Sequence, residues 1–241
     1  MFWGRDMSDV NKMLDIIDFL ENHTTITGTY SIDEKTLEIN IEGSISVEKS
    51  SSGALPYKFG RVTESFFANL CNLNSLKNMP RYVGKMIELA GNNIKNFDDC
   101  PEIEKWNSID LADNKLESLN GFPVSECLNL YLDYNSLTDL IGCPSVKSNI
   151  NVGNNKLTTL KGFKSKNVKS FNCSHNPELE SLEYAPMIAE RFECSYCRLS
   201  DDYIKFFPKK VEFINFSNNN LSIYPSTKYR DCMSIGNRFK N

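Results

Sequence analysis

"IDLADNKLESLNGFPV", residues 109–124, places one asparagine, Asn114, among the regularly spaced apolar residues Ile109, Leu111, Leu116 and Leu119. The spacing of the apolar residues predicts that they are buried, yet a buried amide without a hydrogen-bond partner costs about 1–3 kcal/mol. We therefore expect the side chain of Asn114 to bond to a feature that recurs along the chain.

The same pattern of apolar residues around one small polar residue recurs through most of the chain, for example in "LYLDYNSLTDL" from 130 and "INVGNNKLTTL" from 150. A fixed period of this length is typical of a solenoid, whose coils stack at the strand spacing of about 4.8 Å. Each amide could then bond to the backbone of its own coil and of the neighbouring coil. Successive key residues are separated by 20 to 22 positions: Cys71, Asn92, Asn114, Asn135, Asn155, Asn176, Cys197 and Asn219.

This unit resembles the leucine-rich repeat, L-x-x-L-x-L-x-x-N/C-x-L, over roughly residues 60–225. The resemblance implies an α/β-type leucine-rich repeat solenoid with a parallel strand ladder on the concave face and mostly irregular or short helical return segments. Cysteine can occupy the asparagine position because it is small, is readily buried and makes weak demands on its partners.

The ends of the chain depart from the repeat and predict caps, which a solenoid needs to cover its apolar cross-sections. "SDVNKMLDIIDFLENH" from Ser8 has apolar residues at helical spacing, including Leu14, behind an N-cap serine. "KTLEINIEGSISVEK" from Lys35 alternates across a Glu42-Gly43 turn, as strands do. We expect an N-terminal cap of helix and strands over 1–59, about eight repeats over 60–225, and a C-terminal cap over 226–241, where Cys232, Ile235 and Phe239 also fit a degenerate last coil.

Three stretches are also similar to leucine-rich repeat proteins encoded by tailed bacteriophages and some bacteria: "ALPYKFGRV" at 54–62, "LIGCPSV" at 140–146 and "FNCSHNPELESL" from 171. This resemblance implies a protein made in a bacterial cytoplasm, often during infection, and implies no reaction. The coil around Cys197 departs from the pattern, because it lacks both the asparagine and the proline that follows in other coils.

The positions four, two and one before each key residue are expected to face solvent on the concave surface, because strand side chains alternate between faces. These columns contain five carboxylates and neither lysine nor arginine. Tyrosine beside carboxylate suits a basic protein surface, although the same residues could simply solvate the strands. The predicted partner-binding residues are Phe67, Glu88, Asp110, Asp113, Tyr131, Asp133, Tyr134, His175, Glu193 and Tyr196.

The overall composition argues against several other kinds of partner. The 241 residues carry a formal net charge of -4 and a pI near 5.4, which argues against a strongly basic nucleic-acid binder. No apolar stretch approaches the 18 residues expected of a membrane span, and "MFWGRDMSDVNK" lacks the zones of a signal peptide. We expect a cytoplasmic protein that binds neither nucleic acid nor membrane; its oligomeric state stays open.

The sequence offers little for catalysis. "CSYC", Cys194 to Cys197, has the spacing of zinc or redox sites, with Cys173 and His175 as further possible ligands. The repeat explains the same cysteines as core residues. Phosphate-binding loops are absent, and only two histidines are available for a catalytic triad. We predict no catalytic residue, no metal and no cofactor.

These observations favour a non-enzymatic protein-binding module, encoded by a phage, that binds and inhibits or redirects a host protein such as a defence enzyme. A structural or adhesion component of the virion is the alternative. A zinc-dependent enzyme is a weaker one.

Overall fold

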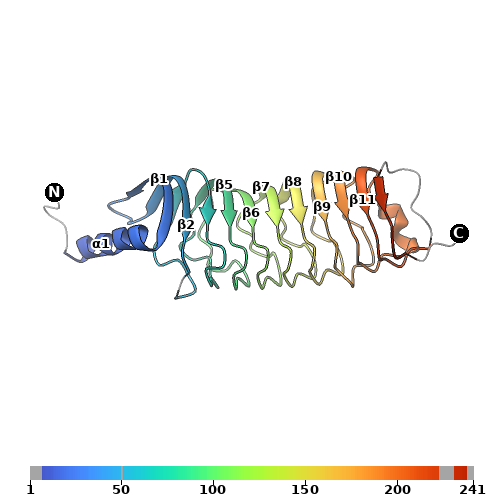
Figure 1. Cartoon of the computed structure of the whole chain (residues 1–241), viewed down its shortest axis with the longest axis horizontal. Coiled ribbons are helices and arrows are strands. Elements are labelled where there is room, and N and C mark those ends of the chain that lie inside the picture. The colour runs from blue at the N-terminus through green and yellow to red at the C-terminus, as the bar shows by residue number, and fades with distance from the viewer. Residues whose placement is uncertain (1–6, 50, 223–230, 238–241) are drawn as a thin grey trace.

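One sheet runs the length of the computed structural model, which describes residues 7–49, 51–222 and 231–237 (Figure 1). The strands follow one another in chain order, except that β4 lies beside the main path and pairs with both β2 and β5. From β2 onward the neighbours are parallel. The strands of the described residues are β1 (Thr24–Ile32), β2 (Ile39–Val47), β3 (Phe59–Val62), β4 (Phe66–Phe67), β5 (Tyr82–Glu88), β6 (Lys105–Asp110), β7 (Glu126–Tyr131), β8 (Ser145–Asn151), β9 (Asn167–Asn172), β10 (Ile188–Glu193), β11 (Lys210–Asn215) and β12 (Asp231–Met233).

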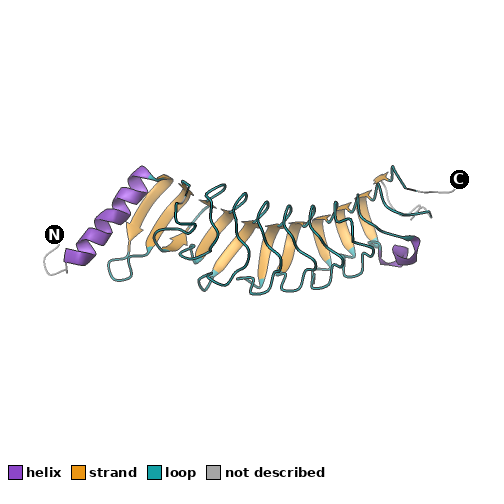
Figure 2. Cartoon of the chain, turned by 90° about the horizontal axis from the view of Figure 1, so that it is seen from below, coloured by secondary structure: helices purple, strands orange, loops and turns teal. Residues whose placement is uncertain are grey.

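The chain returns from each strand to the next through mainly irregular segments, so that strands and loops form a solenoid of about nine turns (Figure 2). The one helical return within the described residues is the 3-10 helix η1, Asp201–Phe206. A continuous apolar core lies between the strands and the returns. The fold is therefore a parallel-strand solenoid with few helices, as the period of the sequence predicts.

The asparagine at the key position joins each coil to the one before it. Asn135 Nδ2 donates to the carbonyl of Leu132 in its own coil, at 3.0 Å, and to that of Leu111 in the preceding coil, at 2.9 Å. Asn135 Oδ1 accepts a hydrogen bond from the N–H of Leu116, at 2.9 Å. Equivalent donor bonds and burial to 8% exposure or less occur at Asn92, Asn114, Asn155, Asn176 and Asn219.

Cysteine at the key position keeps the donor contact to the preceding coil. The thiols of Cys71 and Cys197 lie 3.1 and 3.3 Å from the carbonyl oxygens of Val47 and Cys173. A thiol is a weaker donor and acceptor than an amide, so these two coils are joined less firmly to their neighbours.

A ninth key residue, Asn237, lies in the region that the sequence assigns to the C-terminal cap. Its Nδ2 donates to the carbonyls of Phe216 and Ser234, each at 3.0 Å, and its Oδ1 accepts from the N–H of Asn219 at 3.2 Å. Strand β12 of the same coil pairs in parallel with β11. The repeat thus extends beyond 225, while 226–230 and 238–241 lie outside the described residues.

Helix α1, Met7–Asn22, packs against β1 at the N-terminal end of the solenoid (Figure 1). Its core-facing residues are Met13, Ile16, Phe19 and Leu20. Two details of the prediction were wrong. The helix begins at Met7, so Ser8 lies within it and is not an N-cap, and Leu14 is 54% exposed.

The predicted turn at Glu42-Gly43 was also wrong, because β2 continues through it and pairs along its length with β1, a strand that the sequence analysis did not identify. Gly43 faces Gly28 across this hairpin, with φ values of 136° and 120°. A Cβ on Gly43 would lie 1.9 Å from the carbonyl oxygen of Thr27. The glycine therefore permits a close approach of two strands and does not mark a chain reversal.

Replacing Asn135 by alanine should lower the free energy of unfolding by about 2–3 kcal/mol, because it leaves buried backbone groups without partners. Asn135→Cys should cost less, since a thiol still reaches the preceding carbonyl in two natural coils. Urea unfolding followed by circular dichroism measures both changes. Asn120→Ala, at an exposed position, is the control and should have little effect. Equal effects of the three substitutions would contradict a structural role for the amide.

Candidate protein-binding face

The solvent side of the parallel strands is called the strand face here, and most of the predicted acidic residues gather on it at β5, β6 and β7. Glu88 pairs with Asp110, and Asp110 pairs with Tyr131 on the next strand. Phe67 precedes them in the same column, opposite Glu88. Neighbouring strands lie about 4.8 Å apart, so these side chains are adjacent. We call the following group the acidic patch: Glu88, Asp110, Asp113, Tyr131, Asp133 and Tyr134.

The carboxylates of the acidic patch repel one another. Burial raises the pKa of Asp110, and the charge of Glu88 raises it further. The pKa of Asp133 is raised by burial first, and then by Asp110 and Asp113. Within the described part of the chain, no lysine or arginine lies within ion-pair distance of these carboxylates. The acidic patch therefore carries negative charge that no ion pair neutralises, and two of its carboxylates, Asp110 and Asp133, are partly buried.

The negative charge of Asp110 is not needed for its local hydrogen bond. Asp110 Oδ1 accepts from the N–H of Ala112 at 2.9 Å. Asn172 and Asn215 occupy the equivalent position in later coils. Their neutral amide oxygens likewise accept from the N–H of the residue two positions later. The fold is thus satisfied by asparagine in this column, and the carboxylate adds charge without adding a local bond.

The residue just before the key position adopts a left-handed backbone conformation in every coil. Asp113 and Tyr134 have φ values of 51° and 55°. This conformation lets the N–H of Asp113 donate to the carbonyl of Asp133 in the next coil, at 2.8 Å. It also leaves the side chain at the rim of the strand face, where Tyr134 is 59% exposed. Large residues are uncommon in this conformation because it strains their backbone. If the turn only had to contact water, a smaller residue would serve at a lower conformational energy than Tyr134.

The remaining predicted binding residues form a separate group farther along the solenoid. His175 stacks on Tyr196 with ring centroids 4.5 Å apart, and both are exposed. Glu193 lies in the same column as Glu88 but forms an ion pair with Arg191 Nε at 2.5 Å. The sequence analysis missed Arg191, which lies six positions before Cys197. Strand side chains alternate between faces, so the position six before the key residue also faces solvent, and including it in the analysis would have identified Arg191.

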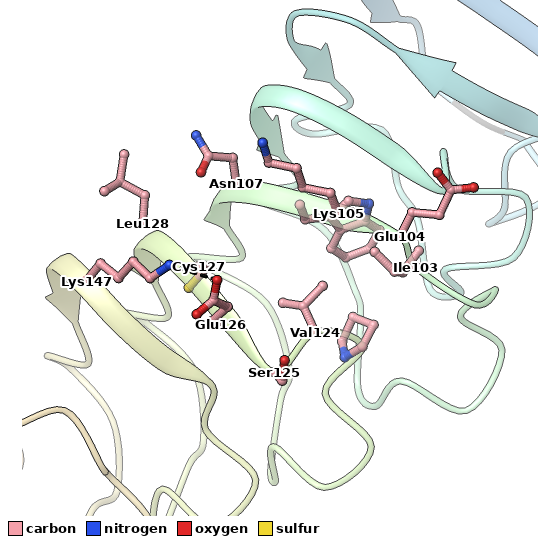
Figure 3. A pocket seen from close by; sticks show the side chains of 12 residues that line it. Ile103, Glu104, Lys105, Asn107, Val124, Ser125, Glu126, Cys127, Leu128 and Lys147 are labelled. Atoms are coloured by element: carbon pink, nitrogen blue, oxygen red, sulfur yellow. Dashed lines mark hydrogen bonds and ion pairs between the residues drawn. The ribbon is translucent and has the colours of Figure 1, made fainter.

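A cavity of about 460 Å³ opens between the first residues of β6 and β7 (Figure 3). These strands pair only from Ser108 and Asn129 onward, so their N-terminal ends separate. The ion pair of Glu126 with Lys147, at 2.7 Å, lies at its wall. Burial raises the pKa of the Cys127 thiol, which also lines the cavity, to about 12. The cavity therefore presents a paired carboxylate and a protonated thiol, neither of which is a ready nucleophile.

The cysteines of "CSYC" lie in the core. Cys194 is completely buried, and Cys197 is 8% exposed with its thiol against the carbonyl of Cys173. Burial raises the pKa of the Cys173 and Cys194 thiols well above their ordinary value. His175 instead lies on the surface. Among the described residues, no group of three or more histidine, cysteine, aspartate or glutamate side chains is placed to hold a metal ion.

No helix in the described ranges is long and apolar enough to cross a membrane. Comparisons with models of protein families, with curated proteins and with solved structures found no match. The class is accordingly defined by the fold itself: a repeat protein built as a parallel-strand solenoid, with an acidic and aromatic patch on its strand face.

Asp133→Asn should stabilise the protein at neutral pH by less than about 1 kcal/mol, a small value because the side chain is only partly buried and water screens its charge. A folded-state pKa above the unfolded-state value means that the ionised carboxylate destabilises the folded state. That destabilisation is absent below the ordinary value of 3.8, grows as the pH rises from there to the folded-state pKa, and is constant above it. Urea unfolding of both proteins at several pH values measures the difference. A stabilisation that persisted below pH 3.8 would contradict the electrostatic cause.

Six native thiols should react slowly with Ellman's reagent at about pH 8, because burial raises the pKa of Cys71, Cys173 and Cys194 and raises the pKa of Cys100, Cys127 and Cys143 to about 12. Denaturation in guanidinium should expose all eight thiols to the reagent, since no cysteine forms a disulfide in the folded chain. Absorbance of the released thiolate follows both reactions. Rapid reaction of more than two thiols per native molecule would contradict the burial of these six side chains.

Proposed function

We propose that the chain is a leucine-rich repeat protein, of the kind encoded by tailed bacteriophages, that binds a host protein in the bacterial cytoplasm and inhibits or redirects it. The asparagine or cysteine at the key position and the 20- to 22-residue period support the repeat type. The stretches "ALPYKFGRV" and "LIGCPSV" support the phage-like origin. The role is stoichiometric binding and requires no catalysis by this chain.

The observation that carries this proposal is the surplus charge of the acidic patch. Asp110 occupies a column in which asparagine makes the same local bond, and the pKa of its carboxyl is raised by burial. A fold under selection for stability alone would gain from asparagine at this position. Retaining unpaired carboxylates is favourable when a cationic partner neutralises them in a complex.

The tyrosines of the patch supply the second part of an interface. Tyr131 is adjacent to Asp110 across the strands, and Tyr134 projects from the rim at 59% exposure. Aromatic rings bury apolar surface at a small entropic cost, while carboxylates steer a positively charged partner to the surface. We infer that the partner presents a lysine- or arginine-rich surface about three coils wide.

The test is capture of a host protein by the immobilised wild-type chain and by the variant Asp110→Lys/Asp133→Lys. The wild-type chain should retain a partner from host lysate, and the variant should lose it, because the double substitution replaces attraction by repulsion. Binding of the purified partner should then be measured by calorimetry. It should weaken as salt rises.

Glu190→Lys/Glu212→Lys is the matched control, since it makes the same change of charge at two exposed positions on β10 and β11. This control should bind as the wild type does. If the patch variant bound the partner as tightly as the wild type does, the acidic patch would not be the interface. If both variants lost the same affinity, the cause would be the change in net charge and not the acidic patch.

A further inference from the structure

The sheet has an unpaired edge at its N-terminal end. Strand β1 is the first in the sheet order and pairs on one side only, with β2. Its nine residues give an edge about 30 Å long. Within the described residues no other strand pairs with this edge. The N–H and C=O groups along it are therefore open to pairing with another strand.

The edge strand itself has none of the sequence features that usually prevent pairing between molecules. Strand β1, "TTITGTYSI", contains no charged residue and no proline, and its pairing with β2 has no bulge. The strand at the opposite end, β12, is only three residues long. Proteins commonly protect an edge with lysine, proline, bulges or short strands, and β1 has none of these.

The sequence of β1 is also self-complementary about its centre. In an antiparallel pair of two copies with Gly28 facing Gly28, Thr27 would face Thr29 and Ile26 would face Tyr30. The outer positions would bring Thr25 opposite Ser31 and Thr24 opposite Ile32. Threonine pairs and pairs of an aromatic with a β-branched residue are favourable across strands. In this register no like charges meet.

We propose that two copies of this chain associate through their β1 strands, antiparallel and with Gly28 on the two-fold axis, to form one continuous sheet. The occupant of the edge is thus a second copy, because the strand matches itself in both hydrogen-bonding direction and side-chain pairs. The contact is isologous and closes after two copies. It goes beyond the binding of a host protein and uses the N-terminal edge of the sheet, not the acidic patch on β5, β6 and β7.

Helix α1 offers additional contact area at the same end of the molecule (Figure 2). It packs against β1, and its Leu14 and Met7 side chains are 54% and 72% exposed. A single strand pair lies at the small end of interface sizes, so the dimer is expected to be reversible and dependent on concentration.

The register is tested by mixing two single variants, Thr27→Cys and Thr29→Cys. Both side chains are exposed, and in the proposed pair position 27 of one copy faces position 29 of the other. An oxidised equimolar mixture should give a cross-linked dimer on a non-reducing gel. Each variant alone, and the wild type with its own eight cysteines, should not. A variant alone should not cross-link, because the same position in the two copies is not directly opposite. The two Cα atoms would lie farther apart than the separation of about 7 Å that a disulfide spans.

Sedimentation velocity over a dilution series tests the association without cross-linking. The wild type should pass from monomer to dimer as concentration rises, and Thr27→Lys should stay monomeric over the same range. Thr138→Lys, an equal change at an exposed position in a return segment, should still dimerise. A wild type that is monomeric throughout, or cross-linking by either single variant alone, would overturn the proposal. Because the acidic patch is untouched, these results are independent of host-protein binding.

Discussion

The structure depends on one constraint: the buried side chain at the key position of each coil must bond to the coil before it. Asn135 illustrates this, because two of its three strongest contacts are to Leu111 and Leu116 of the preceding coil. A single coil offers the amide N–H a carbonyl of its own, at Leu132, but only the preceding coil offers the amide oxygen a donor, so order in one coil requires order in the next. The thiols at Cys71 and Cys197 relax the requirement at two positions and make these the weaker joints of the solenoid.

The same constraint creates the candidate binding face. Because the apolar residues three and five positions before the key residue point inward, those two and four positions before it point outward, and strand pairing sets them beside their counterparts at about 4.8 Å. Identical chemistry in neighbouring coils is therefore brought together. Glu88 and Asp110 meet in this way, and their repulsion adds to the cost of burial. Farther along, Arg191 neutralises Glu193. The strand face is thus divided into an unneutralised acidic region and a balanced one.

The end of a solenoid exposes two different kinds of surface, and they need different cover. The apolar core is covered by α1, whose Ile16 and Leu20 are buried. The polar edge of the sheet needs a hydrogen-bonding partner, which a helix packed against the core does not provide to β1. This separation explains how the chain can cap its core fully and still retain a strand edge suited to pairing with another molecule.

The sequence by itself determined the solenoid, the key positions from Cys71 to Asn219 and the outward columns, because these follow from a strict period and from the cost of burying an unpaired amide. Departures from the period were misread: Gly43 suggested a turn, β1 was not identified, and Asn237 was missed after a spacing of 18 residues. Only the tertiary structure decided these points. The role of Gly43, as a turn or as a site of close contact between strands, depends on segments that only folding brings together. The same is true of which carboxylate forms an ion pair.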